Sequence, residues 1–101
     1  MEIEILVVPD CPHTRPAAEL LRQALDDVGL HGVTVTTRVV TGQGEAERLG
    51  FTGSPTFLIG GRDPFAEAGR PSGLACRVYR TPDGLAGLPG LDQLRQALTR
   101  E

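Results

Sequence analysis

Short runs rich in β-branched residues alternate with stretches of helical spacing, and this alternation constrains the fold more than any other feature. Residues 3–8 (Ile-Glu-Ile-Leu-Val-Val) stop at Pro9 and are typical of a central strand buried on both faces. From Pro16 apolar residues recur three and four positions apart until Gly29, which predicts a helix. Residues 33–40 predict a second strand. A β-α-β start implies a right-handed crossover and parallel pairing of these two strands.

The rest of the chain extends this pattern to a single α/β domain over residues 1–101. The last two predicted strands are joined without a helix, so we expect them to pair antiparallel. The order β-α-β-α-β-β-α then gives a four-stranded mixed sheet with helices on both faces. The remaining predicted elements are a short helix at 45–49, strands at 56–59 and 74–80, and a final helix at 91–99, with a long Gly- and Pro-rich connection at 60–73.

Composition and charge exclude several classes of partner. The formal net charge is −3, with all ten basic side chains being arginines, so nothing predicts nucleic-acid binding. No apolar run approaches the roughly 20 residues that span a bilayer, and residues 3–8 are too short for a signal peptide, so we expect no membrane association. A cytoplasmic location follows as the default, where two cysteines are expected to be reduced.

Cys11 is the residue with the clearest chemical potential. It follows the first strand and precedes the first helix, where free backbone N–H groups and the helix dipole favour an anion such as a thiolate. A protonated His13 would favour the thiolate further, whereas Asp10 would oppose it. Pro12 suits a first helical turn because its missing N–H would be unpaired there anyway.

Two local motifs resemble the thioredoxin superfamily. Residues 11–14 (Cys-Pro-His-Thr) open a helix after a strand, and Ser54-Pro55-Thr56 leads into an apolar strand. The resemblance covers nearly the whole chain in element order, and the Cys-Pro-His triplet is similar to that of bacterial disulfide oxidases. It implies that Pro55 is a cis proline facing the nucleophilic cysteine. It also implies that an extended substrate pairs with the backbone of Ser54.

The chain departs from that family at Thr14. The redox-active pattern of the family is Cys-x-x-Cys, and Thr14 occupies the position of the second cysteine. A conventional dithiol mechanism is therefore not available. Two roles stay open for Thr14: a hydrogen bond to the Cys11 thiolate, as in one-cysteine relatives, or the N-cap of the helix.

Cys76 is the second thiol of the chain. If it lies in a strand antiparallel to 56–59, its distance from Cys11 is roughly 15 Å. A disulfide needs Cα atoms within about 7 Å, so this placement excludes one, although the long 60–73 connection could relax it. The simplest interpretation is a buried small apolar residue.

A second, fainter resemblance gives Cys76 a chemical role. Organomercurial (alkylmercury) lyases also have a cysteine opening a helix, a later Gly-small-Pro before a strand, and a second cysteine in a strand before a final helix. Here Cys11, Gly53-Ser54-Pro55 and Cys76 follow that order. The lyases carry an Asp where this chain has Thr14, and the chain is about half their length.

The sequence therefore supports three functional hypotheses. The first is thiol-dependent redox chemistry on a thiol or disulfide substrate, with Cys11, His13 and Thr14 as catalytic residues and Pro12, Ser54 and Pro55 as substrate-binding residues. The second is lyase-like chemistry or soft-metal binding by Cys11 and Cys76. The third is a non-catalytic binding module, so enzymatic activity is left open.

Other polar residues carry weaker predictions. No cofactor is predicted, and no Cys/His cluster has zinc spacing. His31 is expected in a surface turn. Asp63 and Glu67 could line a pocket, although an Asp-Pro pair such as Asp63-Pro64 more often just starts a turn. Arg77 and Arg80 are expected on opposite sides of a strand.

Overall fold

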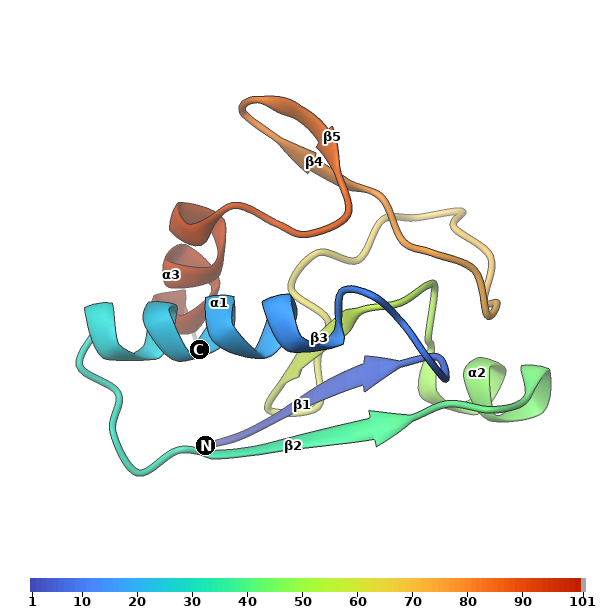
Figure 1. The fold of residues 1–101 in the computed structure, drawn as a ribbon, viewed down its shortest axis with the longest axis horizontal. Coiled ribbons are helices and arrows are strands. Elements are labelled where there is room, and N and C mark those ends of the chain that lie inside the picture. The colour runs from blue at the N-terminus through green and yellow to red at the C-terminus, as the bar shows by residue number, and fades with distance from the viewer. Residues whose placement is uncertain (101) are drawn as a thin grey trace.

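The computed structural model describes residues 1–100 and shows a mixed α/β fold with three helices, a three-stranded sheet and a separate two-stranded sheet (Figure 1). None of the helices in this described range is long and apolar enough to cross a membrane. The elements are β1 (Glu2–Val7), α1 (Thr14–Asp27), β2 (Thr34–Val39), α2 (Gln43–Leu49), β3 (Thr56–Ile59), β4 (Tyr79–Thr81), β5 (Gly84–Ala86) and α3 (Leu91–Arg100).

The main sheet has the order β2-β1-β3, with β1 in the centre. β1 pairs parallel to β2, from Glu2 opposite Thr34 to Val7 opposite Val39, which confirms the predicted parallel β-α-β unit. β3 pairs antiparallel to β1. Every residue of β3 is buried, whereas every residue of β2 is exposed, although both strands lie at the edges of this sheet.

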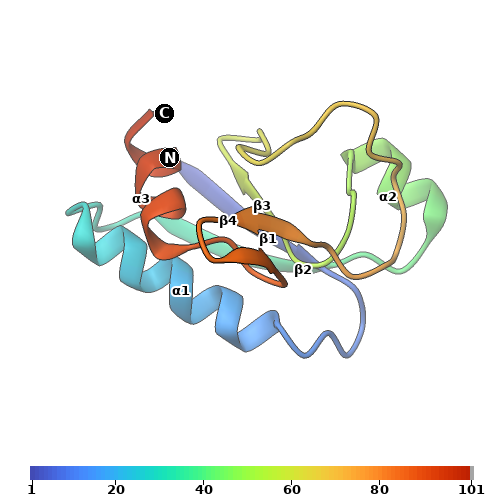
Figure 2. The ribbon, with the colours of Figure 1, turned by 90° about the horizontal axis from the view of Figure 1, so that it is seen from above.

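The helices lie on both faces of the sheet (Figure 2). On one face Ile3, Ile5 and Val7 of β1 pack with α1 and α3 in the larger core. On the other face Leu6 packs with Phe51 and the α2 residue Ala46. The near-continuous apolar run of β1 is thus explained by burial on both faces.

The predicted fourth strand at 74–80 is wrong, and with it the four-stranded sheet. Only Tyr79 and Arg80 of that run lie in a strand, β4, and β4 pairs with β5 in a hairpin that projects from the layers (Figure 1). The outer edge of β3 instead forms backbone hydrogen bonds with other segments at two places. Ile59 and Arg62 exchange backbone hydrogen bonds at one end. Residues 75–77 pair with Ser54 just before the other end, in the parallel direction.

Candidate functional site

Cys11 is held at the end of β1 by a tight turn. Its N–H donates to the carbonyl of Val8 at 3.3 Å, and Asp10, the third residue of the turn, has φ of +58°. A proline at the second position and a positive φ at the third are the features of a type II turn. Pro9 supplies the first, and Asp tolerates the left-handed conformation better than most residues. The Pro9-Asp10 pair therefore fixes where the backbone of Cys11 leaves the sheet.

A second turn carries the chain from Cys11 into α1. The N–H of Thr14 donates to the carbonyl of Cys11 at 3.2 Å, and α1 begins at Thr14. The N-cap is His13, which makes no side-chain capping bond, so the interpretation of Thr14 as the N-cap is wrong. Cys11 is partly buried and packs against the core that α1 and α3 share. Pro12 is exposed.

His13 lies against the chain that leaves β5. A Cβ atom placed on Gly87 would be 2.6 Å from Cε1 and 2.9 Å from Nε2 of His13. Real Cβ atoms do not approach that closely, so the imidazole occupies space that only a glycine leaves free. Nδ1 of His13 is buried and has no hydrogen-bond partner. Gly87 is therefore part of the surroundings of the site, and only its close contact with His13 in three dimensions reveals it.

The Ser54-Pro55 turn lies directly beside the Cys11 turn. Ser54 is fully buried, the Ser54–Pro55 peptide bond is cis, and the Ser54 Oγ accepts a hydrogen bond from the N–H of Val8 at 3.1 Å. Val8 thus binds both motifs, since its carbonyl accepts from Cys11. The two motifs that the sequence analysis selected, 43 positions apart, meet at one end of the sheet.

Cys76 lies at this same end, which corrects its predicted position. It forms an isolated parallel bridge with Ser54. The N–H of Ser54 donates to Ala75 at 2.9 Å, and the N–H of Arg77 donates to Ser54 at 3.0 Å. Because residue 76 and β1 flank Ser54 on opposite sides, Cys76 is two strand spacings, roughly 10 Å, from the line of β1. Both cysteines are free thiols, and Cys76 is exposed rather than buried.

Arg77 anchors this segment in the protein interior. The residue is only 2% exposed, and its guanidinium pairs with Asp63 at 2.7 Å. It also donates to the Thr56 hydroxyl at 3.1 Å and to the Phe65 carbonyl at 2.7 Å, and lies 4.6 Å from the ring centroid of Tyr79. Charge-assisted hydrogen bonds of this kind are among the strongest in proteins. Arg77 therefore fastens residues 75–77 to the start of β3 and to the 63–65 loop.

Tyr79 and Gly53 complete this buried network. The Tyr79 hydroxyl donates to the carbonyl of Pro55, and burial raises the pKa of Tyr79 above its usual range. A Cβ on Gly53 would lie 2.8 Å from Cβ of Arg77, and Gly53 has φ of +135°. Gly53 stands in the Gly-Ser-Pro motif of the sequence, but nothing in the sequence signals its contact with Arg77. The pairing of Arg77 with Asp63 left no local signal because the two are 14 positions apart.

Glu67 belongs to an exposed cluster at the outer end of this network. It pairs with Arg70 at 2.9 Å and with Arg80 at 3.0 Å, and these two hydrogen bonds lower the pKa of Glu67. Glu67 lines a shallow hollow of about 220 Å³, and Asp63 is not among the residues that line it. Asp63, by contrast, forms the ion pair with Arg77.

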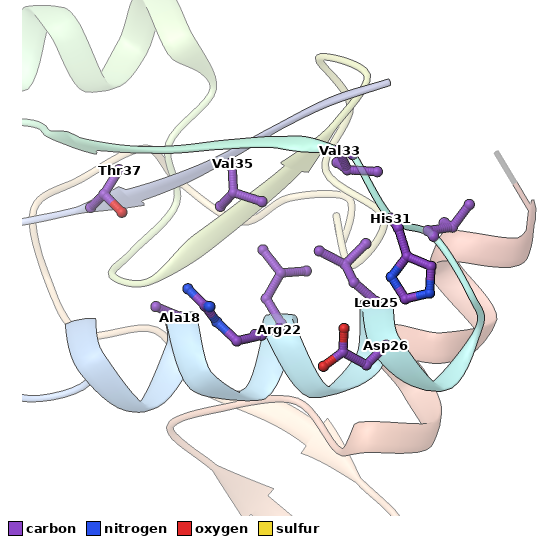
Figure 3. A pocket seen from close by; sticks show the side chains of 11 residues that line it. Ala18, Arg22, Leu25, Asp26, His31, Val33, Val35 and Thr37 are labelled. Atoms are coloured by element: carbon purple, nitrogen blue, oxygen red, sulfur yellow. The ribbon is translucent and has the colours of Figure 1, made fainter.

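A larger groove of about 530 Å³ lies between α1 and β2, away from the cysteines (Figure 3). Arg22 and Asp26 line it from α1, and Val33 and Val35 from the β2 side. The exposed His31 also lines it, in the connection between α1 and β2. None of the predicted catalytic or substrate-binding residues is among its lining residues. The groove is therefore separate from the Cys11 site.

Within residues 1–100 no group of three or more His, Cys, Asp or Glu side chains could hold a metal ion. Comparisons with protein-family models, with curated proteins and with solved structures return no match. The site must therefore be interpreted from its own geometry.

Proposed function

We propose that this chain is a thioredoxin-like, one-cysteine thiol-exchange protein with Cys11 as its nucleophile. The observation that supports this most directly is the double role of Val8. Its carbonyl accepts from the N–H of Cys11, and its N–H donates to Ser54 Oγ. One residue thereby holds the cysteine turn and the Ser54-Pro55 turn together at the end of the sheet.

The proposed reaction proceeds in two exchange steps. The Cys11 thiolate attacks one sulfur of a disulfide RSSR, forming a Cys11–S–S–R bond and releasing RS⁻, which takes up a proton. An external thiolate R′S⁻ then attacks the sulfur of the R group, forming RSSR′ and restoring the Cys11 thiolate. The sum is RSSR plus R′SH giving RSSR′ plus RSH. No second protein thiol is needed, which fits the threonine at position 14.

The neighbouring residues have separate roles in this proposal. The turn of residues 11–14 places Cys11 directly before the N-terminus of α1. His13 is packed against Gly87 on the C-terminal side of the hairpin, so its imidazole is held near the turn. Thr14 presents a hydroxyl at the first residue of the helix. We infer that it can donate to the thiolate, because the N–H of Thr14 already donates to the Cys11 carbonyl and holds the two residues in one turn.

Turnover of a low-molecular-weight disulfide with glutathione as the external thiol tests the proposal. We expect Cys11→Ser to abolish the protein-dependent rate and Cys76→Ser to retain it within about twofold. Intact mass spectrometry with peptide mapping should show a mixed disulfide on Cys11 in the absence of external thiol. A protein-dependent rate that survives Cys11→Ser would refute the assignment of the nucleophile.

A second candidate function is supported by the position of Cys76. Its bridge to Ser54 places a second, exposed thiol at the Cys11 end of the sheet, and a two-coordinate soft metal such as Hg²⁺ needs only two thiolates. Native mass spectrometry with one equivalent of Hg²⁺ distinguishes the two candidates. Metal binding that fails in both Cys11→Ser and Cys76→Ser would favour the two-thiol site. Loss in neither variant, or in only one of the two variants, would exclude a site shared by the two cysteines.

A further inference from the structure

The backbone N–H, the carbonyl and the hydroxyl oxygen of Ser54 each already form a hydrogen bond within the chain. Its N–H donates to Ala75 and its carbonyl accepts from the N–H of Arg77. Its hydroxyl oxygen accepts from the N–H of Val8, and the residue has no exposed surface. An incoming strand would need the same N–H and carbonyl. Residues 75–77 therefore occupy the position in which an extended peptide would pair beside the cysteine turn.

Residues 75–77 are firmly attached in that position. Displacing them would pull Arg77 away from Asp63, Thr56 and the Phe65 carbonyl, and the side chains of Arg77 and Asp63 are only 1% and 11% exposed. Gly53 allows the backbone of Arg77 to approach closely, since a Cβ on Gly53 would lie 2.9 Å from Cα of Arg77. A peptide would have to break a buried ion pair before making its first hydrogen bond to Ser54.

From this geometry we propose that the Cys11 site accepts low-molecular-weight disulfides and thiols and excludes extended polypeptides. The inference rests on the thiol-exchange function proposed above and adds its substrate class. A small disulfide needs only access to the Cys11 sulfur and no pairing with Ser54. Cys11 is partly exposed, whereas Ser54 and Pro55 are buried. Residues 75–77 are thus a specificity element, and Ser54 is a positioning residue rather than a substrate-binding one.

The test compares two probes that carry the same leaving group. One is the mixed disulfide of glutathione with nitrothiobenzoate. The other is the corresponding mixed disulfide of a short, extended peptide with one central cysteine. The experiment uses Cys76→Ser, in which Cys11 is the only thiol, with the double variant lacking both cysteines as the blank. Release of nitrothiobenzoate gives the rate for each probe, and reaction of each probe with free glutathione gives its intrinsic reactivity.

We expect the glutathione probe to react at least tenfold faster than the peptide probe after correction for intrinsic reactivity. The peptide rate should rise linearly with concentration, without saturation. A peptide rate that saturates, or that equals or exceeds the glutathione rate, would overturn the inference and leave the thiol-exchange function standing. Equal rates for the single-cysteine protein and the blank with both probes would instead overturn the proposed function itself.

Amide hydrogen exchange gives an independent readout on the unaltered chain. The amides of Ser54 and Arg77 should be protected, and they should stay protected when a saturating excess of the reduced peptide is added. Strand addition by the peptide would require residues 75–77 to leave, so exchange at the Arg77 amide would accelerate. Such an acceleration would contradict the inference even where the disulfide kinetics agreed with it.

Discussion

Substitution of Asp63 by Asn tests the buried ion pair that fastens residues 75–77. Asn keeps the shape of the side chain and an oxygen that can accept from the N–H of Phe65, now 2.9 Å from Oδ1. It removes the charge that balances the Arg77 guanidinium, which keeps its bonds to Thr56 and to the Phe65 carbonyl. A buried charge that loses its partner is left uncompensated, and this costs several kcal/mol.

The magnitude follows from burial. Removing one partner of a buried pair costs roughly 3–5 kcal/mol, and a hydrogen bond to a charged group contributes roughly 1.5–3 kcal/mol. Because Asp63 is 11% exposed and Asn retains part of the bonding, we expect a loss of about 3 kcal/mol. A domain of this size has a free energy of unfolding of roughly 5–15 kcal/mol, so the loss is a large fraction of the total.

Urea denaturation followed by the helical circular dichroism signal measures this loss. With a denaturant dependence of about 1–3 kcal/mol per molar, the midpoint should fall by roughly 1–3 M. Asp83→Asn, in the exposed turn of the hairpin, is the matched control and should stay within about 0.5 kcal/mol of the parent. A change below about 1 kcal/mol for Asp63→Asn would refute the argument that this pair anchors the segment.

Three further outcomes follow from single residues. Burial raises the pKa of Tyr79, so the folded state keeps the phenol proton to higher pH than the unfolded chain. The free energy of unfolding should therefore fall as pH rises above about 10. Tyr79→Phe should flatten that dependence in urea titrations repeated at several pH values. Asp10→Gly should preserve stability, whereas Asp10→Val, with φ of +58° at that position, should lose about 1–3 kcal/mol in the same assay. Gly87→Ala should displace His13 and change the rate of Cys11 alkylation by iodoacetamide at a fixed pH, while Gly73→Ala, where a Cβ meets nothing within 4 Å, should leave that rate unchanged.

The sequence predicted correctly those parts of the fold that local pattern determines. The apolar run of β1, the three-and-four spacing of α1 and the alternation in β2 each identify their element. Parallel pairing of β1 with β2 follows from the crossover rule. The boundaries moved by one or two residues, as at α1, which begins at Thr14 rather than Pro16. The motifs around Cys11 and Ser54 were also selected from local chemistry alone.

The fourth strand could not be predicted correctly because long-range interactions decide it. Residues 74–80 have the composition of a strand, but the segment is directed by Arg77, whose partners Asp63 and Thr56 lie 14 and 21 positions away. From sequence alone, an arginine within an apolar run is expected to have an exposed side chain. No local pattern indicates that this side chain is buried and paired. The error in the strand also misplaced Cys76, since its predicted distance depended on antiparallel pairing with β3.

The outer edge of β3 is covered by two short backbone pairings instead of a fourth strand. An unpaired edge of a fully buried strand would expose backbone groups to pairing with another chain. The backbone of Arg62 pairs with Ile59 at one end of that edge, and residues 75–77 pair with Ser54 just before the other end. The pairing with residues 75–77 depends on Gly53 having no side chain. Because Ser54 is held by the same contacts, a change in Gly53 or Arg77 must shift Ser54 and, through Val8, the Cys11 turn. Stability of this edge and reactivity of Cys11 should therefore change together, even though Arg77 is not itself a reacting group.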